Sequence, residues 1–176
     1  MGESQMTVDS SMPSHPLNCN WCIWTHLPHD TDWSLNSYTN LFTCTTLEEA
    51  IAISNAIPSK VVQNCMLFIM REGITPLWED PKNKSGGCFS YKLSNKIVYE
   101  SWQKLAYSIM GENLSSNTKL QTHINGITVS PKKNFCIIKI WLASCEFQDA
   151  SSITCKDVID HHGCLFKKHN PEFEMK

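Results

Sequence analysis

The sequence predicts an α+β domain in which helices cover one face of an antiparallel sheet. Short segments that alternate between apolar and polar residues, such as 20–26 and 135–142, are typical of strands. Segment 124–130 is joined to 135–142 by the basic turn Pro-Lys-Lys-Asn, which predicts a hairpin. Few segments show helical spacing, and the links lack the regular crossovers of a parallel sheet. The sheet face without helices is then the natural binding surface.

The first half of the chain is expected to form two strands and one helix. Residues 20–26 alternate between two faces, and a loop rich in Pro, His and Asp then presents Trp33. A Thr-Leu-Glu-Glu capping box opens a predicted helix at 46–56, which a proline follows. Residues 61–71 alternate weakly and are predicted to form the second strand.

The second half begins with a long polar loop at 73–87, which carries Trp78 and ends in two glycines. Residues 88–93 predict a strand. Apolar residues recur at helical spacing over 98–111, so an amphipathic helix is expected there, followed by a loop rich in Ser and Asn. After the hairpin, a third helix is predicted over 146–161.

Length and composition predict one compact domain in the cytoplasm. The 176 residues divide into a polar, flexible leader at 1–14 and a single domain at 15–176. No apolar run approaches the ~20 residues that a membrane span requires, and the leader lacks the features of a secretory signal. Nine cysteines in such a chain are expected to be reduced thiols.

Neither a metal site nor a catalytic site is predicted. Cys19 and Cys22 have the spacing of half a zinc site, but no second close pair follows. His161, His162 and Cys164 are the other candidate ligands, and a polar helix end is the simpler interpretation. No carboxylate pair or nucleophile motif supports an enzyme, and no cofactor is expected.

The net charge and the tryptophans point to a local contact with nucleic acid. A net charge of −2 argues against binding along an RNA backbone, which requires a basic face. Two of the six tryptophans, Trp33 and Trp78, lie among turn-forming polar residues, where no core position is expected.

Several motifs follow one another between residues 15 and 163: HPLNCNW, CIW, TDW, TLEEA, PLWEDPKNKSGG, SWQKLAYSIMGE and IIKIW. Their order and tryptophan spacing resemble the eukaryotic translation initiation factor 4E family. The resemblance implies a curved antiparallel sheet with about three helices on its convex face and a ligand in the concave face. It also implies that the ligand is the 7-methylguanosine cap of messenger RNA.

By this resemblance, Trp33 and Trp78 stack on the two faces of the cap base. Methylation at N7 gives guanine a positive charge, which favours stacking between indole rings through cation-π attraction. Glu79 is expected to accept hydrogen bonds from N1 and N2 of the base, and Trp141 to lie near the N7 methyl group. The alternatives are a loop tryptophan without a binding role, a solvated carboxylate at Glu79 and core packing at Trp141.

The resemblance is weaker where the triphosphate should bind. Lys132 and Lys133 in the hairpin turn are the best candidate cations. Ile137 occupies a position where the family usually has lysine, and Lys139, on the face of Trp141 by strand alternation, is a possible replacement. Cys88 likewise replaces a basic residue. Solvated lysines are the alternative interpretation, and the chain ends where the family has a further strand and a loop over the phosphates.

The convex face is expected to bind a helix from an initiation factor 4G-like scaffold or a co-adapted equivalent. Ile51 replaces the family's partner-binding tryptophan, and Lys104 reverses the charge of a glutamate. These changes predict weak binding to common scaffolds. The predicted surface contains His15, Pro16, Leu17, Leu47, Ile51, Trp102 and Tyr107.

Three functions therefore compete at this stage. The first is a translation initiation factor that binds capped messenger RNA. The second is a cap-binding repressor or competitor that does not recruit the usual scaffold. The third is an enzyme such as a cap hydrolase, and a protein-interaction module without catalytic activity is a further alternative to these three.

Overall fold

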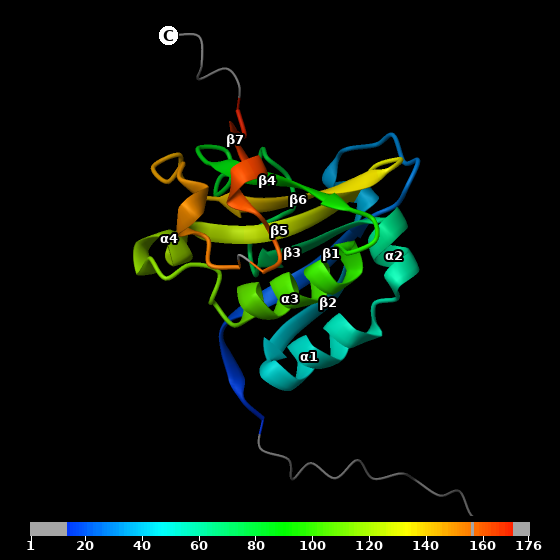
Figure 1. Cartoon of the computed structure of the whole chain (residues 1–176). Coiled ribbons are helices and arrows are strands. Elements are labelled where there is room, and N and C mark those ends of the chain that lie inside the picture. The colour runs from blue at the N-terminus through cyan, green and yellow to red at the C-terminus, as the bar shows by residue number, and fades with distance from the viewer. Residues whose placement is uncertain (1–13, 156, 171–176) are drawn as a thin grey trace, which may run out of the picture.

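One antiparallel sheet of seven strands, in the order β2-β1-β3-β5-β6-β4-β7, organises the protein (Figure 1). The computed structural model describes residues 14–155 and 157–170, so nearly all of the predicted leader lies outside the described residues. The strands are β1 (Pro16–His26), β2 (Tyr38–Thr46), β3 (Met66–Arg71), β4 (Gly87–Ser94), β5 (Ile124–Pro131), β6 (Phe135–Leu142) and β7 (Leu165–Lys168).

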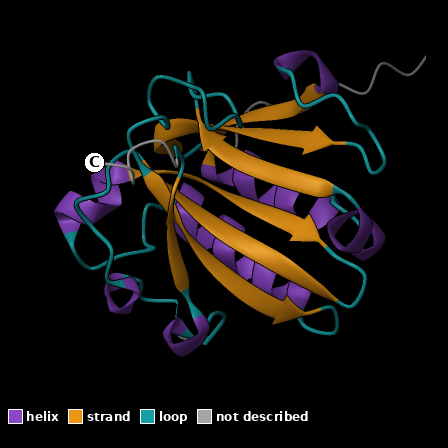
Figure 2. Cartoon of the chain, turned by 90° about the horizontal axis from the view of Figure 1, so that it is seen from above, coloured by secondary structure: helices purple, strands orange, loops and turns teal. Residues whose placement is uncertain are grey.

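The helices cover one face of this sheet, as Figure 2 shows from above. Two long helices, α1 (Leu47–Ala56) and α3 (Val98–Met110), pack side by side under the strands, and the six-residue helices α2 (Ser59–Asn64) and α4 (Thr118–His123) flank them (Figure 1). The main core lies between helices and sheet and contains the fully buried Trp21 and Trp102. The α+β class and the curved sheet with helices on the convex face are confirmed.

Alternation along β6 explains how one strand serves both faces. Ile138 and Ile140 are buried in the main core, whereas Ile137 and Lys139 are only partly buried and point to the concave face. The concave face holds a second, smaller cluster of Phe68, Met70, Ile74 and Trp141. The concave face, which none of the described helices covers, is therefore partly apolar and open to a ligand.

The predicted capping box is present at the start of α1. The backbone N–H of Glu49 donates to Oγ1 of Thr46 at 3.2 Å, and the carboxylate of Glu49 accepts from the backbone N–H of Thr46. This reciprocal pair satisfies donors that the first turn of a helix leaves free.

The strand predicted over 61–71 is wrong in its first part. Residues Ser59–Asn64 form α2, and the strand β3 begins only at Met66. Val62 is fully buried in the main core, so packing outweighs the preference of valine for strands.

The helix predicted over 146–161 is also wrong. The described part of this segment forms a loop with a 3-10 turn at Ala150–Ser152, and a second turn follows at His161–Gly163. The side chains of Asp149 and Asp160 accept backbone hydrogen bonds at these turns, which competes with a continuous helix.

Three further elements were not predicted. The edge strand β2 is mostly polar and exposed and therefore lacks a clear alternation. The Ser/Asn-rich loop contains α4, which Asn117 caps. After Gly163 the chain does form a strand, β7, which pairs with β4 and corrects the expectation that it ends without one.

None of the described helices has the length and apolar character that crossing a membrane requires.

Candidate functional site

A cavity of about 240 Å³ on the concave face brings together all four residues predicted to bind the base. We call it the base pocket. Trp33 comes from the β1–β2 loop, Trp78 and Glu79 from the β3–β4 loop, and Lys139 and Trp141 from β6. The remaining lining residues are Tyr38, Met66, Phe68, Pro76 and Leu77. Segments far apart in the sequence therefore converge on one apolar hollow with a carboxylate and an ammonium group.

The loop that carries Trp33 is held against the sheet by His26. The two rings stack with centroids 4.4 Å apart and an interplanar angle of 3°, and Trp33 remains 57% exposed. Nε2 of His26 lies 2.8 Å from the carbonyl oxygen of Asp32, so Nε2 must carry a proton and donate to it. The indole is thus positioned before any ligand arrives.

The loop that carries Trp78 is ordered by two polar side chains. The Asp80 carboxylate accepts from the backbone N–H and hydroxyl of Thr75 at 2.8 and 2.7 Å. Asn83 is fully buried, and its amide donates to the carbonyl oxygen of Leu77 at 2.8 Å. These bonds hold the loop in shape and leave the Trp78 side chain 41% exposed. Asn83 therefore shapes the turn.

Glu79 is exposed beside these rings, and its negative charge affects Tyr38, which also lines the pocket. Burial, followed by the negative charge of Glu79, raises the pKa of Tyr38 above its usual value. Tyr38 also packs edge-on against Phe68, with centroids 5.4 Å apart. The carboxylate therefore lies at the mouth of the pocket, where it is free to accept hydrogen bonds from a ligand.

Trp141 forms part of both the concave cluster and the pocket lining. Its side chain is 7% exposed, and its indole N–H donates to Oγ1 of Thr128 at 2.7 Å. His169, just after β7, covers the ring with centroids 4.7 Å apart. These contacts explain much of why a tryptophan occupies this position. Since the ring also lines the base pocket, its contact with a base stays a prediction.

His169 is expected to make the protein less stable at mildly acidic pH. Burial, followed by the positive charge of Lys139, lowers the pKa of His169 from its usual 6.5 to about 4. As the pH falls below 6.5, the unfolded chain takes up a proton at this residue, whereas the folded protein does not until about pH 4. The free energy of unfolding is therefore unaffected by this residue above pH 6.5 and falls as the pH drops to 4, by about 3 kcal/mol.

Urea unfolding at pH 7 and pH 4.5, compared between the wild type and His169→Gln, measures this contribution. The wild type should lose more stability between the two pH values than the variant does. Equal losses would contradict the assignment to His169.

The structure separates the three lysines predicted to bind phosphates. Lys139 lines both the base pocket and an adjoining groove of about 440 Å³. Lys132 lines that groove as well, with Ile137 at its floor. Lys133 lines a larger cavity of about 690 Å³, whose lining also includes Trp33 and Lys132. Lys132 and Lys139 are therefore grouped, and Lys133 stands apart from Lys139.

Most of the predicted convex surface is exposed, but Trp102 is not. Leu47, Ile51 and Tyr107 have side chains that are 38–45% exposed on α1 and α3. Trp102 is fully buried in the main core, which corrects its inclusion in a partner-binding surface.

Polar contacts tie the rest of the convex surface together. His15 Nδ1 lies 2.6 Å from the carboxylate of Glu48, and the hydroxyl of Tyr107 donates to Asn55 at 2.8 Å. Pro16 begins β1, and Leu17 packs against the main core. The candidate contacts with a partner are thus Leu47, Ile51 and Tyr107.

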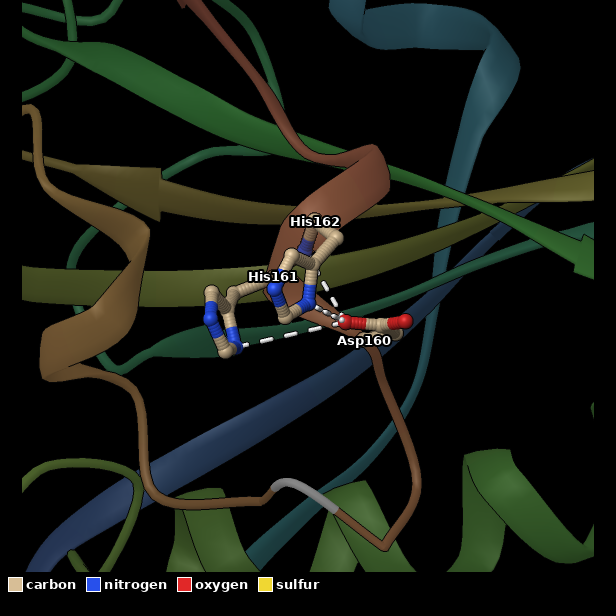
Figure 3. Close-up of side chains that lie close together, drawn as sticks. All are labelled: Asp160, His161 and His162. Atoms are coloured by element: carbon tan, nitrogen blue, oxygen red, sulfur yellow. Dashed lines mark hydrogen bonds and ion pairs between the residues drawn. The ribbon is translucent and has the colours of Figure 1, made fainter.

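The candidate metal ligands lie at two places in the described structure. Cys19 packs against the main core, whereas Cys22 contacts Thr43 at 3.4 Å from the other face of β1. Asp160, His161 and His162 do lie together, as Figure 3 shows, but Asp160 accepts from the backbone N–H of His162 and caps a 3-10 turn. The group is a local turn structure at the surface.

Several residues of the site were missed from the sequence. Tyr38 is on the unpredicted strand β2, and Met66 and Phe68 lay in a segment whose faces were not distinguished. Lys92, which lines the groove beside Lys139, was missed too. Strand alternation along 88–93 would have placed Lys92 on the concave face.

An aromatic pocket that continues into a lysine-lined groove is an arrangement typical of proteins that bind a nucleotide by stacking. Comparison with known proteins identifies the family. The family model described as eukaryotic initiation factor 4E matches residues 16–174, and the chain therefore belongs to this family.

Individual relatives agree with this assignment. The eukaryotic translation initiation factor 4E of Eremothecium gossypii is 30% identical over 151 residues, which are 81% of this chain and 69% of that protein. The structure of Ascaris suum eIF4E-3 with m7G cap has a TM-score of 0.77 at 21% identity and covers 90% of this chain and 93% of that one. C. elegans eIF4E-3 in complex with the 4E-binding protein Mextli has a TM-score of 0.67 at 20% identity, with coverage of 76% and 78%.

Proposed function

We propose that this protein binds the 7-methylguanosine cap of messenger RNA in the base pocket and acts as a translation initiation factor. The observation that carries the proposal is that Trp33 and Trp78, both largely exposed, line one pocket with Glu79. Exposed indoles normally cost solubility, and a cationic base between them would remove both from water. A protein of the same fold has been solved in complex with the m7G cap, which supports a cap as the ligand.

Each group in the pocket has a distinct task in this proposal. The two indoles stack on the methylated base, and Glu79 accepts hydrogen bonds from N1 and N2, which adenine cannot donate. Trp141 closes the pocket on the side of the N7 methyl group. Lys139 and Lys132 contact the triphosphate, since they lead out of the pocket into the groove. Lys133 is left as an outlying cation near Trp33.

Binding without turnover is the expected activity. The test is a competition between two RNAs of one sequence, one capped and one ending in an uncapped triphosphate, for the immobilised protein. Capped RNA alone should be retained and recovered unchanged. Equal retention of both RNAs would overturn the proposal, and release of a nucleotide from the capped RNA would indicate an enzyme instead.

A cap-binding repressor is the second candidate, and the convex surface favours it. Ile51 and Leu47 offer aliphatic contacts only, and Lys104 is an exposed cation beside them on α3. Asn55 already accepts hydrogen bonds from Tyr107 and Gln103, so these polar side chains bond to one another within the protein. A relative of the same fold binds a 4E-binding protein, which supports a protein partner for this chain too.

A generic scaffold peptide, Tyr-x-x-x-x-Leu-hydrophobic, is therefore expected to bind with a Kd in the micromolar range or weaker. The protein offers this peptide no aromatic anchor at Ile51, and the peptide would face the positive charge of Lys104. Fluorescence anisotropy of a labelled peptide measures this affinity, and Lys104→Glu should strengthen binding. Nanomolar binding to the wild type would contradict the expectation and favour the initiation factor over the repressor.

A further inference from the structure

Four lysines meet in the groove that adjoins the base pocket. Lys92 is on β4, Lys132 on the β5–β6 turn, Lys139 on β6 and Lys167 on β7. We call this feature the lysine groove. Its lining is completed by Ser90, Ser130, Phe135, Ile137, Gly163 and Leu165.

The pairing of the strands shows the direction in which the groove runs. Lys139, which also lines the base pocket, pairs with Ser90 on β4, and Ser90 pairs with Leu165 on β7. Lys92 pairs with Ile137, two residues or about 7 Å further along β6. The groove therefore leads from the base pocket toward β4 and β7, the strands at the far edge of the sheet.

Among the residues that the structure describes, no acidic side chain compensates the positive charge of the lysine groove. No acidic residue is among the described residues that line it. The ammonium group of Lys92 lies over the ring of Phe135, 4.4 Å from its centroid. Elsewhere in the described chain, Lys119 pairs with the carboxylate of Glu146, a partner that the groove lysines lack. Convergent ammonium groups without counter-charges repel one another, and an anion with several charges relieves that repulsion.

The number and position of the charges distinguish two sections of the groove. The bridging triphosphate of a cap carries about one negative charge on each phosphate. Lys139 lines both the base pocket and the groove and so lies where the bridge leaves the pocket, and Lys132 lines the groove from the β5–β6 turn. Lys92 and Lys167 lie beyond them on β4 and β7. The hydroxyl groups of Ser90 and Ser130 add neutral donors that suit phosphate or ribose oxygens.

We propose that the lysine groove holds the RNA chain that follows the cap, with Lys92 and Lys167 contacting its first backbone phosphates. This inference rests on the proposed cap binding, which sets where the RNA enters. The protein then contacts a few nucleotides beside the cap, in agreement with an overall charge that disfavours binding along a long RNA.

The test compares 7-methyl-GTP with a capped ten-nucleotide RNA in three proteins: the wild type, Lys92→Gln/Lys167→Gln and the control Lys60→Gln/Lys119→Gln. The control removes two exposed lysines from α2 and α4, outside the groove. The groove variant should bind 7-methyl-GTP within about twofold of the wild type but capped RNA at least about tenfold more weakly. The slope of log K against log salt concentration should be shallower by ~1.4, since each of the two lost contacts with a single strand contributes ~0.7. The control should match the wild type.

The outcomes separate this inference from the proposed function. Equal loss of affinity for both ligands would mean that the groove holds the triphosphate bridge, and it would overturn the inference alone. Unchanged affinity of the groove variant for capped RNA would also overturn it. Failure of the wild type to bind 7-methyl-GTP would overturn the proposed function and the inference together.

Discussion

Trp78→Ala is expected to weaken binding of 7-methyl-GTP by about a hundredfold or more. One stacked base contributes ~1–3 kcal/mol, and a cation-π contact that is shielded from water adds about 2 kcal/mol. Trp33→Ala should have an effect of similar size, since the two indoles contact opposite faces of the base. Isothermal titration calorimetry measures both losses, and the weaker binding of GTP should change much less.

The control for this prediction is Tyr107→Ala. Tyr107 is an exposed aromatic side chain on α3, on the face of the sheet opposite the base pocket. Its removal should leave the affinity for 7-methyl-GTP unchanged. If Tyr107→Ala weakened binding as much as Trp78→Ala does, the loss would reflect a general effect on the fold rather than stacking.

Glu79→Gln should weaken binding of 7-methyl-GTP by about ten- to a hundredfold. The carboxylate accepts two charge-assisted hydrogen bonds in the proposed complex, and such bonds contribute about 1.5–3 kcal/mol. Glutamine keeps the size of the side chain but turns an amide N–H₂ toward a donor of the base. Selectivity for 7-methylguanine over 7-methyladenine nucleotides should fall by a similar factor in parallel titrations.

Glu72→Gln is the matched control for charge. Glu72 lies at the start of the same loop, exposed to solvent, and accepts a hydrogen bond from Asn20. Its replacement removes one negative charge near the site without touching the base pocket. Similar losses in both variants would show that Glu79 acts through net charge and does not read the base.

The sequence predicted those parts of the fold that have a strong local signal. The capping box at Thr46 and the helical spacing of 98–111 define α1 and α3 almost to the residue. The errors fall where tertiary contacts outweigh local preference. Val62 is drawn into the core as part of α2, and Asp149 and Asp160 cap short turns in place of a third long helix.

The candidate site was predictable where single residues stood out from their surroundings. Trp33 and Trp78 are tryptophans in polar loops, and Lys139 shares the face of Trp141 by strand alternation. The sequence could not show that His26 stacks on Trp33, because that contact depends on how the β1–β2 loop folds back onto the strand. It also could not reveal the lysine groove, whose members come from separate strands that are brought together by pairing.

A fluorescence titration of the wild-type protein with 7-methyl-GTP and with GTP tests the central claim most directly, because stacking on Trp33 and Trp78 should quench their emission. Strong quenching at low concentrations of 7-methyl-GTP, with GTP requiring at least about a hundredfold more, is the expected result. Identical curves for the two nucleotides would contradict the proposed recognition of a cationic base, and the pocket would then need another ligand.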